Sequence, residues 1–125
     1  MFEVELTDNP FARFLTAHIE NAAQPYEKSH SLVGYVCFWI VFEELRMMNL
    51  AVSPHVRHRG IGRWLLQQAL TMGRKQGARR ALLEVRVSNQ PAVALYEHAG
   101  FSRSGIRTKY YTSPIEDAVL MELEL

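Results

Sequence analysis

Arg57-His58-Arg59-Gly60-Ile61-Gly62 is the stretch that decides the fold, because it joins an apolar run, Met47–Val52, to an amphipathic helix that begins near Ile61. Two glycines let the backbone turn sharply and approach a ligand closely. The amides of the turn and of the first helical turn then point outward, with the positive end of the helix dipole behind them. The pattern predicts a cradle for a pyrophosphate, although a plain strand-to-helix turn shares the same local features.

The composition is that of a single globular domain spanning residues 1–125. Hydrophobic residues make up 48% of the chain and charged residues 22%, which is typical of a soluble protein. The net charge of +1 gives no global field that would favour nucleic acid or a membrane as partner. The longest apolar run, Leu32–Phe42, is too short to span a bilayer, and no signal peptide is visible, so a cytoplasmic location is expected by default.

Cysteine and histidine usage argues against a disulfide and against a metal site. The single cysteine, Cys37, excludes an intrachain disulfide. It lies in the apolar run Leu32–Val41, where a small buried hydrophobe is a better interpretation than a nucleophile. The five histidines show no metal-ligand spacing, so no metal is expected.

Residue patterns in the first half predict strands joined by a polar loop and a tight turn. The mixed aromatic and aliphatic pattern of the first segment favours a strand, although a helix fits it too. The second is apolar throughout, as in a strand buried on both faces. The expected elements are a strand over Phe11–Glu20, a loop over Asn21–Ser31, a strand over Leu32–Phe42, a turn at Glu43-Glu44 and an antiparallel strand over Leu45–Val52.

The second half predicts helices alternating with strands. A helix over Ile61–Gln76 has an apolar face, basic residues in its last turn and a glycine after its end. A polar cap followed by proline starts a second helix. The further elements are a strand over Ala81–Val87, a short helix over Ala92–Ala99, and strands over Phe101–Ile106 and Ala118–Leu125. Together the elements indicate a mixed sheet with helices packed on it.

Four blocks of sequence carry a family resemblance. They are MNLAVSPHVRHRGIGRWLL (48–66), LLEVRVSNQPAVALYEHAGF (82–101), IRTKYY (106–111) and EDAVLMEL (116–123). In this order and spacing the chain resembles, over about residues 10–125, the GNAT superfamily of acetyl-CoA-dependent N-acetyltransferases. It is most similar to the RimI-type ribosomal-protein-alanine N-acetyltransferases.

The resemblance implies an α/β fold of the GNAT type. Its sheet is mixed but mostly antiparallel, with helices on both faces. The sheet is split between two central parallel strands, here Leu45–Val52 and Ala81–Val87, and the pantetheine arm of acetyl-CoA lies in the split. Acetyl-CoA is therefore the expected cosubstrate.

The resemblance also assigns cofactor-binding residues. The pyrophosphate loop is bound mostly through backbone amides and comprises Arg57, His58, Arg59, Gly60, Ile61, Gly62 and Arg63. Leu50, Ala51 and Val52 pair with the pantetheine like an added strand, and one amide there polarises the thioester carbonyl. Asn89 contacts the pantetheine arm or its phosphate end, and its position also suits a helix cap.

Glu84 is an acidic residue inside an otherwise apolar strand. A carboxylate there costs free energy unless it is paired or functional. Arg86 is two residues further on, hence on the same face, and a structural ion pair between them is one interpretation. The resemblance implies another, in which Glu84 is the general base that takes a proton from the attacking amine through a water.

Three tyrosines have both structural and functional interpretations. A tyrosine on a helix that faces a sheet is usually a core residue, but the resemblance makes Tyr96 the general acid that protonates the departing CoA thiolate. Tyr110 and Tyr111 match a loop that forms the slot for the substrate N-terminus, whereas an exposed aromatic hairpin is the structural alternative.

The chain departs from the family at its start. Family members carry a strand and a pair of helices before the strand that matches Phe11–Glu20, whereas here only Met1–Pro10 precedes it. We expect this segment to be a remnant of the N-terminal helical region. A sheet edge would then be exposed, which favours a homodimer through that edge.

Three functions remain open from the sequence. The first is transfer of an acetyl group to the N-terminal α-amine of a protein, such as a ribosomal protein. The second is acetylation of a small-molecule amine or a lysine. The third is a CoA-binding remnant without transfer activity.

Overall fold

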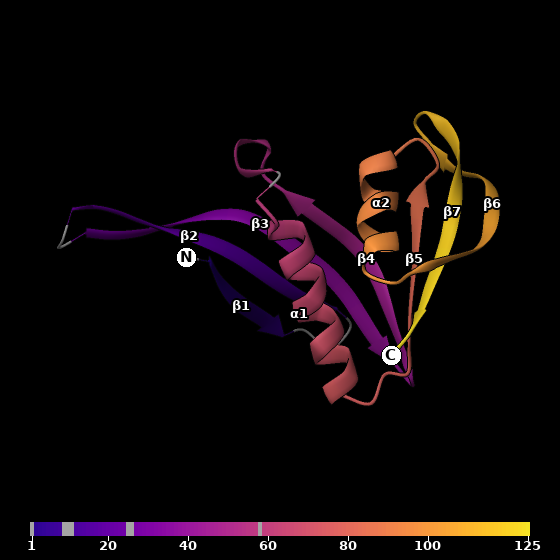
Figure 1. The fold of residues 1–125 in the computed structure, drawn as a ribbon, viewed down its shortest axis with the longest axis horizontal. Coiled ribbons are helices and arrows are strands. Elements are labelled where there is room, and N and C mark those ends of the chain that lie inside the picture. Colours follow the sequence, from indigo (N-terminus) through magenta and orange to yellow (C-terminus); the bar gives the residue numbers. More distant parts are fainter. Residues whose placement is uncertain (1, 9–11, 25–26, 58) are drawn as a thin grey trace.

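The computed structural model describes residues 2–8, 12–24, 27–57 and 59–125. These residues form a seven-stranded sheet with two helices (Figure 1). The strand order is β1-β2-β3-β4-β5-β7-β6, and only β4 and β5 pair in parallel. This confirms the mixed, mostly antiparallel sheet with two central parallel strands. The elements are β1 Phe2–Asp8, β2 Arg13–Gln24, β3 Glu27–Val41, β4 Glu44–Val52, a 3-10 turn Pro54–Val56, α1 Ile61–Lys75, β5 Arg80–Arg86, α2 Gln90–His98, β6 Ser102–Thr112 and β7 Ile115–Glu124.

The sheet splits between β4 and β5. The two strands pair only where Glu44–Arg46 lies beside Arg80–Leu82. Beyond that point β4 stays with β3 and β5 stays with β7, so the sheet opens into a V (Figure 1). A register shift opposite Cys37 and Phe38 leaves Met48 as an extra residue in β4. A bulge bends its strand, which carries β4 away from β5 at this point.

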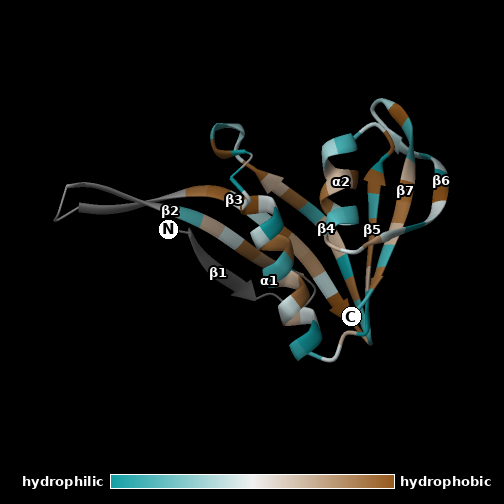
Figure 2. Cartoon of the chain, in the orientation of Figure 1, coloured by the Kyte–Doolittle hydropathy of each residue, from teal (hydrophilic) through white to brown (hydrophobic). Residues whose placement is uncertain are grey.

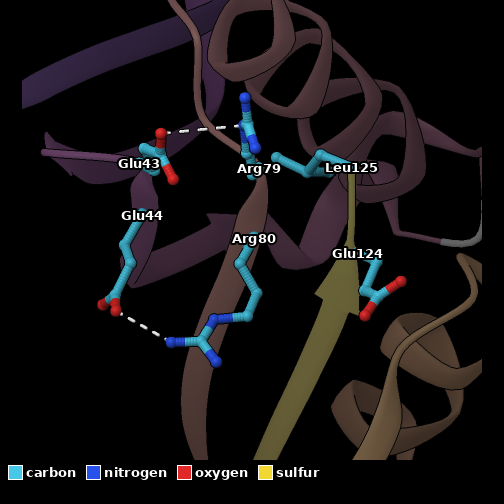
Figure 3. Close-up of a pocket in the computed structure, with 6 residues that line it drawn as sticks. All are labelled: Glu43, Glu44, Arg79, Arg80, Glu124 and Leu125. Atoms are coloured by element: carbon cyan, nitrogen blue, oxygen red, sulfur yellow. Dashed lines mark hydrogen bonds and ion pairs between the residues drawn. The ribbon is translucent and has the colours of Figure 1, made fainter.

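Ion pairs close the narrow end of the V (Figure 3). Arg80 Nη2 of β5 lies 2.9 Å from Glu44 Oε1 of β4, and Arg46 Nη2 lies 2.9 Å from the other oxygen of Glu44. The hydrogen bond from Arg80, with help from Arg46, lowers the pKa of Glu44. The amides of Arg79 and Arg80 both donate to the carbonyl of Glu43. These contacts join β4 to β5 just before the strands separate.

Both helices pack on the same face of the sheet. On β4, Leu45 lies against Gly73 of α1, and Leu45 is the sheet neighbour of Ala81 in β5. Near the other end of α1, Gly62 lies between Val52 of β4 and Leu95 of α2. The expectation of helices on both faces is therefore wrong for the described residues. The reason lies in the connection from β1 to β2, residues 9–11, which is too short for a helix pair.

The open second face of the sheet also corrects the interpretation of β3. The apolar run Leu32–Phe42 was expected to be buried on both faces. Its buried members include Val36 and Phe38, but Trp39 is 37% exposed and Phe42 is 95% exposed. An all-apolar strand thus has one face in the core and one partly in solvent.

The core lies between the sheet and the apolar stripe of α1 (Figure 2). The stripe is buried at Ile61, Leu65, Leu66, Ala69, Leu70 and Gly73. The predicted helix Ile61–Gln76 is confirmed to within one residue at its end. Cys37 is buried, and burial raises the pKa of its thiol. Both observations fit a packing role for Cys37 rather than the role of a nucleophile.

Four segments differ from their predictions. The segment expected as a helical remnant, Met1–Pro10, contains the strand β1. The loop expected over Asn21–Ser31 is largely strand, because β2 and β3 continue as a hairpin with Asn21 opposite Ser29 and Gln24 opposite Glu27. The last two strands, predicted as Phe101–Ile106 and Ala118–Leu125, lie closer together, as β6 reaches Thr112 and β7 begins at Ile115. In β1, Phe2, Val4 and Leu6 do alternate with polar residues, whereas the β2–β3 hairpin and the end of β6 continue through polar residues without such alternation.

Gly34 permits the close approach of β3 to α1. A Cβ at this position would lie 2.9 Å from the carbonyl oxygen of Ala51 and 3.2 Å from Leu65 Cδ1. Because the nearer atom belongs to the backbone, we expect Gly34→Ala to lower the free energy of unfolding by about 1–3 kcal/mol. Gly105→Ala is the matched control, since its Cβ would meet only Leu120 Cδ1 at 3.6 Å. Urea unfolding curves that do not separate the two variants would contradict this packing.

Candidate active site

The turn before α1 has the geometry of an anion cradle. Gly60 adopts φ 79° and is the N-cap of α1. The first helical bond runs from the amide of Trp64 to the carbonyl of Gly60. The amides of Ile61, Gly62 and Arg63 therefore precede the hydrogen-bonded part of the helix, and no described side chain caps them. These donors, with the helix dipole behind them, suit a phosphate.

Of the described arginines of this loop, one contacts the end of β4 and two are exposed. Arg57 Nε lies 3.4 Å from the carbonyl oxygen of Val52, which ties the loop to the end of β4. Arg59 and Arg63 are exposed. His58, which the sequence assigned to the same loop, lies outside the described residues.

A cavity of about 450 Å³ connects the cradle to the split in the sheet. One wall is the end of β4 and the opposite wall is α2. Every described residue of the predicted cofactor site except Arg59 and Asn89 lines it. The lining residues are Leu50, Ala51, Val52, Val56, Arg57, Gly60, Ile61, Gly62, Arg63, Pro91, Ala92, Leu95 and Tyr96.

A second cavity, of about 340 Å³, brings the two candidate catalytic residues together. Glu84 comes to it from β5 and Tyr96 from α2. It shares Leu50, Ala92 and Tyr96 with the first cavity. The cradle, the split and the two candidate catalytic side chains therefore form one continuous surface.

Glu84 points to the side of β5 that faces away from the core. Its neighbours Leu83 and Val85 are buried, whereas the Glu84 side chain is 33% exposed. Its carboxylate Oε1 lies 3.6 Å from Arg107 Nη1 of β6. Partial exposure and this arginine explain how an apolar strand tolerates a carboxylate.

Arg86 does not pair with Glu84. Its guanidinium instead donates to the carbonyl of Pro114 at 3.1 Å and to Glu116 Oε2 at 3.2 Å. The ion pair between Glu84 and Arg86 that the strand spacing suggested is therefore wrong. Arg107, the actual partner, was missed because it lies 23 positions further along the chain on another strand.

Tyr96 is a buried phenol at the junction of the two cavities. Only 8% of the residue is exposed, and its ring packs edge-on against Phe101 with centroids 5.7 Å apart. Burial, with a smaller contribution from Tyr111, raises the pKa of Tyr96 to about 12. The phenol is therefore protonated at neutral pH and can donate a proton or a hydrogen bond into the cavity.

Asn89 caps α2, as its sequence position predicted. Its Oδ1 accepts a hydrogen bond from the amide of Ala92 at 3.3 Å. Asn89 also lines the second cavity, so the cap and a contact with a bound ligand are compatible.

Tyr110 and Tyr111 lie near the end of β6 and face different parts of the site. Their rings are 5.0 Å apart and nearly perpendicular. Tyr111 lines the second cavity beneath the guanidinium of Arg86, 4.3 Å away. Burial, Tyr110 and Glu84 each raise the pKa of Tyr111, which reflects its position beside the catalytic candidates. Tyr110 is 42% exposed and lines a third cavity.

Comparison with known proteins shows the family to which this chain belongs. The model of the acetyltransferase (GNAT) family matches residues 2–101. The chain belongs to the GNAT family. A Bacillus subtilis protein assigned as a ribosomal protein bS18-alanine N-acetyltransferase is 39% identical over 120 residues, which are 96% of this chain and 74% of that protein. This membership places the chain among the acetyl-CoA-dependent N-acetyltransferases.

Comparisons with an Escherichia coli sequence and with an E. coli crystal structure support the same family. The ribosomal protein bS18-alanine N-acetyltransferase is 41% identical over 96 residues, 75% of this chain but only 65% of its own length. This chain therefore aligns with slightly less than two thirds of that relative. The crystal structure of the E. coli ribosomal-protein-S18-alanine N-acetyltransferase superposes with a TM-score of 0.78 and 31% identity, covering 94% of this chain and 71% of that one.

The site has the donor set that the GNAT cosubstrate acetyl-CoA requires. The amides at the start of α1 suit its pyrophosphate, and the cavity between β4 and α2 is lined by apolar side chains that suit its pantetheine arm. Across the described ranges, no group of histidine, cysteine and acidic residues could hold a metal. Neither described helix is long and apolar enough to cross a membrane.

Proposed function

We propose that this GNAT protein acetylates the N-terminal α-amine of a protein, with a ribosomal protein that begins with alanine as its substrate. The observation that carries the proposal is a cavity that both Glu84 and Tyr96 line and that shares lining residues with the cavity of the pyrophosphate cradle. The names of the B. subtilis and E. coli relatives support the choice of ribosomal protein bS18. Such a substrate would locate the enzyme in the cytoplasm.

Glu84 is the general base in this proposal. Its carboxylate accepts a proton from the α-amine, directly or through one water, so that the nitrogen lone pair can attack the thioester carbonyl carbon. A protein α-amine has a pKa of about 8, against about 10.4 for lysine, so less help from a carboxylate is needed to deprotonate it. This difference favours an α-amine over a lysine as acceptor.

Backbone amides at the diverging end of β4 stabilise the charge that develops on the carbonyl oxygen. Past Arg46, the edge of β4 that faces β5 pairs with no described strand, so amides of the Leu50–Val52 segment are available there. The carbon–nitrogen bond forms and the carbon–sulfur bond breaks. Tyr96 then gives its phenolic proton to the thiolate, which leaves CoA and the acetylated N-terminus as products.

Two peptides separate the proposal from its first alternative. One has a free N-terminal alanine and no lysine, and the other has a blocked N-terminus and one lysine. We expect acetylation of the alanine peptide at least about tenfold faster, because its amine is the more easily deprotonated. The proposal fails if the lysine peptide is the better substrate. Acetyl-CoA binding without acetylation of either peptide would favour the CoA-binding remnant instead.

Homodimerisation also stays a proposal. β1 is an edge strand of the sheet, so a second copy could pair with it. Sedimentation that shows a monomer at high protein concentration would count against this dimer.

A further inference from the structure

The charges of this chain are distributed unevenly along its sequence. Between Glu44 and Glu84 there is no aspartate or glutamate, although 13 of the 125 residues are acidic. The same segment holds eight basic residues, and the net charge of +1 conceals them because every acidic residue lies outside it. The eight are Arg46, Arg57, Arg59, Arg63, Arg74, Lys75, Arg79 and Arg80.

The outer face of α1, defined by Arg63, Gln67, Thr71, Arg74 and Lys75, lies at the centre of this segment. The helix packs on β2, β3 and β4 through its buried stripe (Figure 1). The five residues of the outer face are all exposed, and their spacing of three to four residues places them together on one side of the helix. Cations at both ends of this face are therefore joined by polar, uncharged side chains.

The charge on the outer face of α1 is not balanced by ion pairs. Arg79 and Arg80, which follow the helix, pair with Glu43 and Glu44. In contrast, no carboxylate of the described residues pairs with a cation of the outer face. This face therefore presents unneutralised positive charge to solvent.

Two simpler explanations account for only part of this charge. Cations in the last turn of a helix complement its dipole, which accounts for Arg74 and Lys75. Cations near the first turn suit the pyrophosphate of acetyl-CoA, which accounts for Arg59 and Arg63. Neither explains why the whole helix lacks the acidic residues that commonly pair with arginine and lysine one turn away. At about 1.5 Å per residue, Arg74 also lies about 20 Å along the helix from the cradle at Gly60.

We propose that the outer face of α1 is a docking surface for the phosphate backbone of RNA. Arginine, lysine, glutamine and threonine are the side chains that contact phosphates in nucleic-acid complexes. A double helix carries about one phosphate per 1.7 Å of its axis, so the stretch of about 16 Å from Arg63 to Arg74 meets several. Trp64, the one aromatic residue of α1, is half-buried, so the face has no exposed ring for base stacking. Docking is therefore independent of base sequence.

The surface chemistry favours RNA over a membrane or a protein partner. No large hydrophobic residue is exposed on α1, whereas a helix that lies on a membrane inserts an apolar face. Protein interfaces are likewise rich in aromatic residues and methionine at their centre. The choice of RNA also rests on the proposed function, because a ribosomal protein is assembled on ribosomal RNA.

The position of the docking surface leaves the catalytic groups accessible. The helix α1 covers one face of the sheet, and Glu84 of β5 points to the other. RNA on α1 therefore does not cover the proposed base. An enzyme held on RNA meets a ribosomal-protein substrate at a raised effective concentration.

A labelled RNA duplex of about 20 base pairs tests the proposal by fluorescence anisotropy, without acetyl-CoA or acceptor peptide. We expect saturable binding at about 50 mM KCl, with a slope of about −3 for log K against log salt, as for about four phosphate contacts. Two duplexes of unrelated sequence should bind equally. No binding at this salt concentration, or a strong preference for one sequence, would overturn the proposal.

A double variant locates the binding on α1. Arg74→Ala combined with Lys75→Ala should bind the duplex about tenfold more weakly at about 50 mM KCl, with a slope shallower by about two. Arg103→Glu is the matched control, because it also removes two units of positive charge, from an exposed position on β6. The control should bind within about twofold of the unaltered protein. An equal loss of affinity in both would show that only net charge matters and overturn the assignment to α1.

Activity measurements separate this inference from the proposed function. Because Arg74 and Lys75 line neither the cofactor cavity nor the catalytic one, the double variant should acetylate the alanine peptide at the unaltered rate. RNA binding by a protein that acetylates no alanine peptide would remove the proposed function and retain the docking surface. The reverse result would remove the docking surface alone.

Vesicles that contain phosphatidylglycerol distinguish RNA from a membrane. At equal phosphate concentration, we expect the duplex to bind more tightly than the vesicles, because the outer face of α1 has no apolar side chain to insert. Tighter binding of the vesicles, lost in the double variant, would make an anionic membrane the partner and overturn the assignment of RNA.

Discussion

Glu84→Gln should lower kcat for an alanine-initiated peptide by about 100-fold or more, because an amide cannot accept the proton that the α-amine must lose. Glutamine has nearly the same size and retains an oxygen that can face Arg107, so the fold and the cavity should persist. The affinity for acetyl-CoA should remain unchanged, since the pyrophosphate cradle lies at the start of α1 and Glu84 does not line the cofactor cavity. Steady-state kinetics and a binding titration measure the two effects separately.

The matched control for this variant is Glu97→Gln. Glu97 is a half-exposed carboxylate of α2 that pairs with Arg103 outside the catalytic cavity. Its replacement should leave kcat within about twofold of the unaltered protein, as surface ion pairs contribute little. A Glu84→Gln enzyme with full turnover would show that another group, or solvent, removes the proton.

Tyr96→Phe should also reduce kcat by about 100-fold, because it removes the proton donor for the leaving thiolate and nothing else. The phenylalanine ring keeps the edge-on contact with Phe101, so the free energy of unfolding measured in urea should change by no more than about 1 kcal/mol. With the phenol pKa at about 12, the unaltered enzyme should lose no activity through ionisation of Tyr96 below about pH 10.

A second substrate distinguishes proton donation from positioning. An activated thioester whose thiol has a low pKa needs no acid to leave, so it should restore most of the turnover of Tyr96→Phe. If the variant is equally slow with both thioesters, the hydroxyl acts by orienting the substrate instead. Turnover within about twofold of the unaltered enzyme on acetyl-CoA would remove Tyr96 from the mechanism.

Local chemistry explains why the centre of the fold was predictable. The apolar stripe of α1, the glycines of the Gly60-Ile61-Gly62 turn and the Asn89 cap each act within a few residues, and each is confirmed in position. The parallel pair β4 and β5 was implied by the family resemblance, and the helix between the strands accounts for it, because such a crossover returns the chain in the same direction.

Most of the features that were not predicted depend on contacts between residues that lie far apart in the sequence. The long hairpin of β2 and β3 continues through polar residues. The strand β1 does follow an alternation of Phe2, Val4 and Leu6 with polar residues, which the expectation of a helical remnant passed over. The partner of Glu84 is Arg107, brought near by the pairing of β6 with β7 rather than by proximity in sequence. The amide of Lys109, whose φ is 50°, likewise donates to Asp117 Oδ1 on the neighbouring strand β7. Long-range register therefore determines the details of the acceptor side of the site.

Calorimetric titration of the purified protein with acetyl-CoA is the most direct test of the central claim, that the split between β4 and β5 and the turn before α1 form a working cosubstrate site. The account predicts saturable binding with one molecule of acetyl-CoA per chain, at an affinity that the Glu84→Gln variant shares. Absence of binding by the folded protein would contradict it, because neither the base nor the acid would then have a thioester on which to act.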